Sequence, residues 1–167
     1  MNKDLRPSFL AVLFAVATGA AHAQSTAADE AAIRDARRTQ TQALARDDLD
    51  NVVKYRTPDI TIRRALGHPV EGASAARVLP EPTGSANPAT CVIYQREAAS
   101  VSASSNWPPA CEEGRWSGHP ASVDAKPMLS GRYSAQWVKR NGSWFIRSEL
   151  FVAIDGAAAG CSAVALA

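Results

Sequence analysis

The stretch GRYSAQWVKRNGSWFIRSELFVAI, residues 131–154, is the strongest structural signal in the sequence. Two runs of alternating apolar and polar residues flank Asn141-Gly142, the dipeptide that two-residue type I′ turns prefer. The alternation places Tyr133 and Trp137 on one face of the first run. We therefore expect a long β-hairpin. Because a lone hairpin is marginally stable in water, the rest of the chain should supply more strands and a covering layer.

Two helices are expected upstream of this hairpin. From Ala28 to Arg46, Ile33 and Gln40 fall on one helical stripe, and the charged residues at 34, 35, 37 and 38 fall elsewhere, where we expect solvent. A second, short helix should start at Asp48 and run to Tyr55. It should close before Pro58, because the residue before a proline avoids helical angles.

The remaining segments read mostly as strands. The expected order is a strand over 60–66, a small helix over 73–79, a surface loop over 80–90, a strand over 91–104 bent near Ala98-Ala99, and a strand over 110–117. Helices followed by a run of strands predict an α+β domain, with the helices on one face of a curved, mainly antiparallel sheet.

Residues 1–23 have the pattern of a secretory signal peptide. Lys3 and Arg6 precede a short apolar run, and Ala21-His22-Ala23 supplies an A-x-A cleavage site. An uncleaved anchor helix is the alternative, but the apolar run is shorter than the roughly 20 residues of a membrane span. We expect export to the bacterial periplasm or the medium, a domain over 24–156 free of the membrane, and a disordered tail over 157–167.

Charge and cysteine usage exclude several classes. The chain holds 18 Lys and Arg against 16 Asp and Glu. No basic stripe appears, so we expect no nucleic-acid partner. The cysteines are Cys91, Cys111 and Cys161, an odd number that leaves the disulfide state open. No C-x-x-C motif and no His at ligand spacing from a Cys occurs, so we expect no metal site, and no cofactor motif is present.

Two stretches resemble the SnoaL-like and ketosteroid-isomerase-like branch of the nuclear transport factor 2-like superfamily. They are ALARDDLDNVVKYRTPDITIRRALGHPVEG, residues 43–72, and GRYSAQWVKRNGSWFIRSELF, residues 131–151. The resemblance implies a cone-shaped α+β roll with N-terminal helices on the concave face of the sheet. The fold hosts isomerases, dehydratases, cyclases, hydrolases and binding modules, so it does not define an activity.

The residues of ketosteroid isomerases are not retained. By this resemblance the general base would fall on Arg64, which cannot act as a base at neutral pH. The oxyanion tyrosine would fall on Gln40, and the late-strand acid on Tyr133 or Ser134. Steroid-isomerase chemistry is therefore not expected.

Arg64 is instead a candidate anchor for the acidic group of a small ligand. Parity places it on the face of Ile60 and Ile62, which is the concave face in this fold. A buried guanidinium must be paired. The alternative is an internal ion pair to Glu113 or Glu149.

Three residues are candidates for acid/base chemistry. Glu149 could act if it faces inward, but alternation with Trp144 and Ile146 favours the outward face. His68 lies at a turn near the expected cone mouth and could equally be a solvated loop residue. Tyr133 could donate a hydrogen bond to a substrate.

Aromatic residues should fill or line the interior. They are Tyr55, Trp116, Tyr133 and Trp137, with Gln40 on the facing helix. Three hypotheses follow: an exported protein that binds a small, acidic organic ligand in an apolar pocket; an enzyme that transfers protons on a small apolar substrate; and a module that dimerises through its exposed sheet face.

Overall fold

The computed structural model describes residues 13–46, 48–65, 68–72, 92–120 and 124–156. Its helices and strands, in chain order, are α1 (Leu13–Ala45), α2 (Leu49–Val53), β1 (Arg56–Arg63), β2 (Val70–Glu71), β3 (Val92–Ala103), β4 (Pro109–Pro120), β5 (Leu129–Arg140) and β6 (Ser143–Gly156). The expected small helix over 73–79, the loop over 80–90 and the tail over 157–167 lie outside the described residues.

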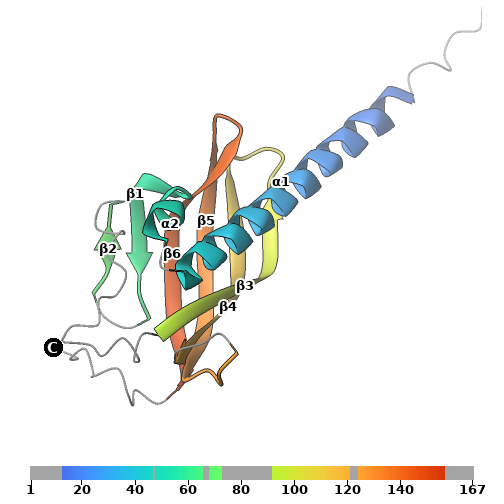
Figure 1. Cartoon of the computed structure of the whole chain (residues 1–167). Helices are drawn as coiled ribbons and strands as arrows, with labels where there is room; N and C mark the ends of the chain where they lie inside the picture. The colour runs from blue at the N-terminus through green and yellow to red at the C-terminus, as the bar shows by residue number, and fades with distance from the viewer. Residues whose placement is uncertain (1–12, 47, 66–67, 73–91, 121–123, 157–167) are drawn as a thin grey trace, which may run out of the picture.

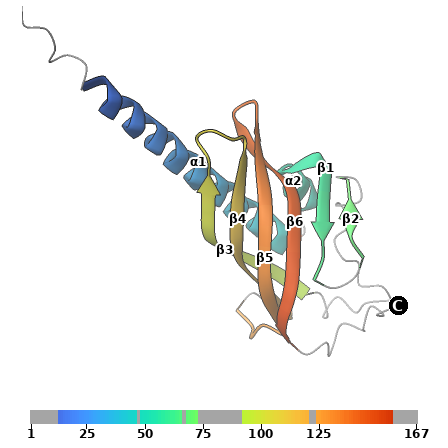
Figure 2. The ribbon, with the colours of Figure 1, turned by 180° about the vertical axis from the view of Figure 1, so that it is seen from behind.

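The strands form one sheet in the order β2-β1-β6-β5-β4-β3. The β1·β6 pair is parallel and the other pairs are antiparallel. The long helix α1 crosses one face of this sheet and packs mainly against β3 (Figure 1). Seen from behind, β3 to β6 present a face that α1 does not cover (Figure 2). The α+β architecture predicted from the sequence is confirmed.

The hairpin expected over residues 131–154 is formed by β5 and β6. Asn141 and Gly142 have φ angles of 50° and 79°. Two successive positive φ values are what a type I′ turn requires, and Asn and Gly tolerate them best. Tyr133 and Trp137 are both buried on the face that α1 covers. This part of the prediction is confirmed.

Several boundaries differ from the expected ones. The short helix ends at Val53, and β1 begins at Arg56, because Ile146 of β6 donates its backbone N–H to the Tyr55 carbonyl at 2.8 Å. Pro58 is accommodated inside β1, where the pairing with β6 is interrupted between Arg56 and Thr61. A proline lacks the N–H that a regular ladder needs, so it belongs at such an interruption.

Three bulges interrupt the antiparallel pairs among the described strands: one in β3 at Ala99, and two in β6 at Arg147 and Ile154. The expected bend in β3 is confirmed: Ala98 pairs with Gly114 and Ser100 with Glu113, which leaves one extra residue in β3. In β6, Arg147 is the extra residue, because Ile146 pairs with Trp137 and Ser148 with Gln136. A bulge shifts the side-chain alternation by one position. The bulge at Arg147 decides where Glu149 points.

Candidate functional site

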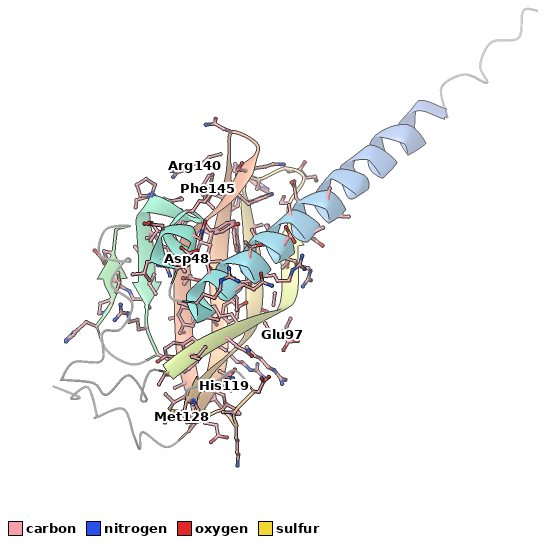
Figure 3. All side chains as sticks on the ribbon, viewed as in Figure 1. Asp48, Glu97, His119, Met128, Arg140 and Phe145 are labelled. Carbon is pink, nitrogen blue, oxygen red and sulfur yellow. The ribbon has the colours of Figure 1, made fainter. Side chains whose placement is uncertain are left out.

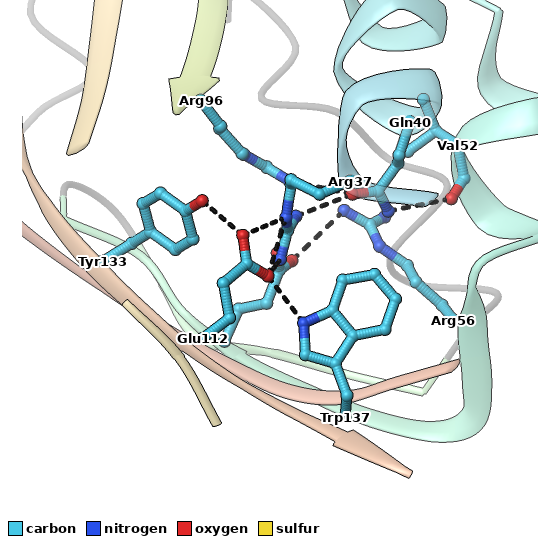
Figure 4. Close-up of polar contacts among 9 residues, drawn as sticks. Arg37, Gln40, Val52, Arg56, Arg96, Glu112, Tyr133 and Trp137 are labelled. Atoms are coloured by element: carbon cyan, nitrogen blue, oxygen red, sulfur yellow. Dashed lines mark hydrogen bonds and ion pairs between the residues drawn. The ribbon is translucent and has the colours of Figure 1, made fainter. Parts of the chain in front are cut away.

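Between α1 and the sheet lies a group of buried polar side chains, which we call the interior cluster (Figure 4). Helix α1, strand β1 and strands β3 to β6 all contribute to it. Its members are Arg37, Gln40, Arg56, Arg96, Glu112, Tyr133, Trp137 and Glu149. Buried polar groups carry a large desolvation cost unless they are paired. The pairing within the cluster therefore decides what this interior can do.

Glu112 on β4 is the most heavily hydrogen-bonded member. Arg37 donates to its carboxylate from Nε at 2.9 and 3.0 Å and from Nη2 at 2.9 Å. Tyr133 donates its hydroxyl at 2.5 Å, and Trp137 donates Nε1–H at 2.6 Å. Such charge-assisted bonds are about twice as strong as neutral ones. Glu112 is fully buried, so these bonds replace its hydration.

Glu149 on β6 is the second buried carboxylate. Its Oε1 lies 2.8 Å from Nη1 of Arg37 and 3.2 Å from Nη1 of Arg96, and its Oε2 lies 3.7 Å from Nη2 of Arg56. Burial acts to raise the pKa of Glu149, but the positive charges of Arg96, Arg37 and Arg56 outweigh it and lower the pKa to about 2. Glu149 is therefore ionised at neutral pH.

Arg37 connects the two carboxylates to the helices. Its Nη1 also donates to Oε1 of Gln40 at 2.7 Å, and Gln40 Nε2 donates to the Val52 carbonyl at 3.1 Å. The guanidinium lies 5.2 Å from the ring centroids of both Tyr133 and Trp137. Burial alone would lower the pKa of Arg37, but the two carboxylates raise it above its usual value. Arg37 is thus a charged link between α1 and the sheet.

The other two arginines experience an excess of positive charge. The pKa of Arg56 is lowered to about 10, mainly by burial; Glu149 opposes this shift, and the charges of Arg96, Arg37 and Arg64 add to it. The pKa of Arg96 is also lowered, mainly by burial. Three arginines against two carboxylates give the interior cluster a net positive charge. Each arginine contacts one of the two carboxylates, and the net positive charge that remains in this buried region favours an anion nearby.

Arg96 marks where the interior cluster approaches solvent. Its side chain keeps 10% of its surface exposed, whereas Glu149 beside it has none. The guanidinium stacks over the ring of Phe151 at 4.9 Å from the centroid, and Phe151 itself is half-buried. A guanidinium that stacks on an aromatic ring can still donate hydrogen bonds to a carboxylate from the N–H groups in its own plane. A small anion could meet the cluster here.

The structure brings four of the sequence-predicted residues together. Gln40, Tyr133, Trp137 and Glu149 belong to the interior cluster. The other four are not members of it. Tyr55 is half-buried against the hydrophobic core, and Trp116 is buried, with its Nε1 donating to the Val152 carbonyl at 3.2 Å. Arg64 is half-buried just beyond β1, and His68 is exposed. Burial lowers the pKa of Arg64, and its charge acts on Arg56.

Two expectations about facing are wrong. Glu149 points inward, with 2% of its surface exposed, because the bulge at Arg147 shifts the alternation of β6. Arg37 is 1% exposed rather than solvated. Glu113, one of the two partners in the alternative reading of Arg64, is exposed, and its neighbour Glu112 takes the buried position. Charged side chains are buried in this interior, beside the apolar residues that the sequence predicts there.

Sequence reasoning also missed Arg37, Arg56, Arg96 and Glu112 as interior residues. For Arg37 a signal existed: it lies four residues after Ile33 and three before Gln40, so it shares their stripe on the helix. Charged residues are rarely buried, so Arg37 is expected in solvent although the helical spacing places it on the buried stripe. For Arg56, Arg96 and Glu112 no local signal exists, because their burial depends on partners that lie far away in the sequence.

Other site types are scarce in the part of the chain that the structure describes. No helix there combines the length and hydropathy of a membrane span. No three or more His, Cys, Asp or Glu side chains there come close enough to hold a metal ion. Cys111 is an exposed free thiol, and Cys91 and Cys161 lie outside the described residues.

Comparisons with known proteins identify the fold. The chain is similar to an NTF2-like protein of unknown function from Pseudomonas putida, with a TM-score of 0.64 and 18% identity over 77% of this chain and 89% of that one. A domain of unknown function with a cystatin-like fold from Nostoc punctiforme gives a TM-score of 0.63 at 16% identity, over 78% and 80% of the two chains.

A third solved structure is an NTF2-like protein of unknown function from Shewanella oneidensis, with a TM-score of 0.56 and 16% identity over 72% of this chain and 95% of that one. No protein-family profile matches the sequence. No curated protein sequence matches it either. At these identities the likeness establishes the NTF2-like cone fold, and the fold alone.

Proposed function

We propose that the protein binds a small organic acid at the Arg96 end of the interior cluster, and that it belongs to the SnoaL-like branch of this fold. The observation that supports the proposal is the charge of the cluster: Arg37, Arg56 and Arg96 face two carboxylates, Glu112 and Glu149. A bound carboxylate would neutralise the excess. Arginine is suited to this role because its planar fork binds carboxylates in bidentate geometry.

The surroundings of Arg96 indicate what the rest of the ligand resembles. Phe151 stacks against the Arg96 guanidinium and against Tyr133, whose ring centroid lies 5.7 Å away. Arg64 adds a further positive charge close to Arg56. Aromatic faces beside a cationic end suit a ligand with one apolar and one acidic end. We therefore still propose Arg64 as an anchor for the acidic group of the ligand.

The experiment is native mass spectrometry of the protein purified from its own host, which reports bound ligand and oligomeric state together. Arg64→Ala then tests the anchor, and Arg63→Ala is the matched control, because Arg63 is an exposed neighbour paired with Glu71. We expect the ligand to be acidic and to be lost from Arg64→Ala only. A neutral ligand, or equal retention by both variants, would contradict the proposal.

An enzymatic role for Glu149 is less well supported. A general acid or base works best when its pKa lies near the working pH. Glu149, with its pKa lowered to about 2, would be a weak base and would hold no proton to donate at neutral pH. His68 is exposed and lies outside the interior cluster. The charge of the cluster therefore favours binding over proton transfer at this site.

A second candidate function is self-association through the uncovered sheet face. Leu150, Val152 and Ile154 expose 49%, 51% and 64% of their surfaces along β6, the third strand of the sheet. Beside Leu150 lies a groove of about 470 Å³ whose lining includes Thr61, Ser134 and Ser148. Contiguous exposed apolar surface commonly marks an interface. We propose that a second copy of this chain covers it.

We also propose that the protein acts after export. The evidence is the signal-peptide pattern of residues 1–23. The contacts of α1 are compatible with removal of that segment: Asp29 accepts a hydrogen bond from Lys139 at 2.6 Å, and Glu30 accepts one from the Ala103 N–H at 3.3 Å. Amino-terminal sequencing of the protein from the periplasmic fraction tests this. Gln24 as the first residue supports export with cleavage, and an uncut Met1 contradicts it.

A further inference from the structure

A second polar site lies further along β4, on the sheet face opposite to that of Glu112. Ser117 and His119 are two residues apart on this strand, so both side chains point to the face opposite to that of Glu112 and Trp116. Figure 3 shows His119 beside Met128, at the end of the sheet remote from the Arg140 hairpin tip. The backbone of Met128 donates to the Gly118 carbonyl at 2.9 Å, which holds the following segment against β4.

The hydrogen bonds of His119 determine its tautomer. Nδ1 lies 2.6 Å from the Ala125 carbonyl oxygen, which can only accept, so Nδ1 carries the proton. In the neutral imidazole Nε2 is then a free acceptor, and it lies 2.8 Å from the Ser117 hydroxyl. Ser117 therefore donates its hydroxyl proton to Nε2. His119 is 6% exposed, so its ring is fixed in this orientation.

This arrangement has the three parts of an activated serine. They are a hydroxyl, an imidazole base within hydrogen-bond reach, and a third group that orients the imidazole. In the Ser-His-Asp triad the orienting group is a carboxylate, whereas here it is the Ala125 carbonyl. Ser117 is only half-buried, so in the monomer a substrate can approach its hydroxyl. Ile154 of the proposed dimer interface lines the same groove, so the reaction is assigned to the free monomer.

The groove beside Ser117 is positively charged. Its volume is about 660 Å³, and its lining includes Ser117, Ser130, Arg115, Arg132 and Glu97, together with Arg96 of the interior cluster. Arg115 and Arg132 are direct cross-strand partners, as are Ser117 and Ser130. Like charges directly opposite each other destabilise a sheet, although Glu97 opposes Arg115 on its other side. Two adjacent arginines would attract an anionic substrate and stabilise a developing oxyanion.

We propose that Ser117 and His119 hydrolyse a carboxylic ester whose acyl part carries a negative charge. The Ser117 Oγ forms a bond to the ester carbonyl carbon, and His119 Nε2 takes the hydroxyl proton. The tetrahedral oxyanion collapses, and the alcohol leaves with the proton from the imidazolium. Water, deprotonated by the same imidazole, then cleaves the acyl-serine and releases the acid. This activity goes beyond the proposed ligand binding: its reacting groups are Ser117 and His119, although Arg96 lines the same groove.

The test is covalent labelling of the purified protein with a fluorophosphonate, which transfers its phosphorus to an activated serine and releases fluoride. Peptide mass spectrometry locates the adduct. We expect one adduct, on Ser117. Ser117→Ala should abolish labelling, whereas Ser130→Ala, which removes the facing serine of the same groove, should keep it. Labelling of His119→Gln should slow by at least ~100-fold, the usual contribution of a general base.

The variants also separate chemistry from folding. Ser117→Ala removes only a half-buried hydroxyl, so thermal unfolding should remain close to that of the wild type. If His119→Gln does not fold, the comparison of Ser117→Ala with Ser130→Ala still decides. Absence of any adduct on the folded wild type, an adduct on a residue other than Ser117, or an unchanged rate in folded His119→Gln would overturn the proposal.

Discussion

Arg37 on α1 binds Glu112 on β4 through two of its nitrogens, with both side chains fully buried and Nη2 2.9 Å from Oε2. The pair joins the helix to the middle of the sheet. In this interior the ion pair therefore holds the helix against the sheet, which apolar packing does in most domains. Breaking a buried pair from one side leaves an uncompensated charge, which costs more than the pair itself contributes. The predictions below start from that asymmetry.

Replacing Glu112 by Gln should destabilise the fold strongly. The change leaves the Arg37 guanidinium facing a neutral amide, and Tyr133 and Trp137 lose a charged acceptor. Removing one partner of a buried ion pair costs about 3 to 5 kcal/mol. Urea denaturation measures the free energy of unfolding. Glu113→Gln is the matched control, because Glu113 is exposed; a change there should stay within about 0.5 kcal/mol. Equal effects of the two variants would refute the assigned facing.

Acid should destabilise the protein through Glu149. Its pKa in the folded state is about 2, below the ordinary 4.5, so the folded state holds the proton less tightly than the unfolded state. Its stabilising contribution is complete above about pH 4.5 and is lost as the pH falls towards 2. The difference corresponds to about 3 kcal/mol. Unfolding free energies measured across this range should fall in the wild type. In Glu149→Gln the decline should be shallower; an identical decline would show that Glu149 is not the group responsible.

The sequence predicts the hairpin, the α+β order and the bend in β3, because each has a local cause. Asn141-Gly142 specifies its turn, and alternation specifies which face Tyr133 and Trp137 occupy. These causes act within a few residues, so they can be read without knowing the fold.

The interior cluster could be predicted only in part, because its causes are not local. The bulge at Arg147 has no distinctive residue, yet it reverses the facing of Glu149. The burial of Arg37 depends on Glu112, which lies 75 residues further along the chain. Glu112 and Glu113 are equivalent in composition, and only the register with β5 separates them. Pairing across strands decides such positions.

The bulge can be tested by deletion. Removing Arg147 takes out the extra residue and leaves the pairing of β5 with β6 on either side unchanged, so Glu149 should still face inward and the variant should fold. Removing Leu150, from the regularly paired part of the same strand, would instead turn Phe151 to the outer face, so we expect a severe drop in the melting temperature. Circular dichroism distinguishes the two. An Arg147 deletion as unstable as the Leu150 deletion would contradict the role given to the bulge.

Dimerisation through the uncovered sheet face should depend on the apolar residues of β6. The double variant Val152→Glu and Ile154→Glu places like charges at the centre of the proposed interface, so it should be monomeric. Sedimentation velocity measures the change. Trp107→Glu is the control: Trp107 is 72% exposed but lies between β3 and β4, so its replacement should leave the dimer intact. A wild type that is monomeric at every concentration would exclude this interface.

Binding of a small carboxylate at Arg96 tests the central claim most directly. Ligand-detected NMR can compare a panel of aromatic carboxylates with the corresponding amides, using the wild type, Arg96→Gln and the exposed control Arg38→Gln. We predict that carboxylates bind and their amides do not, that Arg96→Gln weakens binding at least ~10-fold, as loss of about 1.4 kcal/mol implies, and that Arg38→Gln binds as the wild type does. Equal binding of amides and carboxylates, or unchanged affinity in Arg96→Gln, would contradict the account.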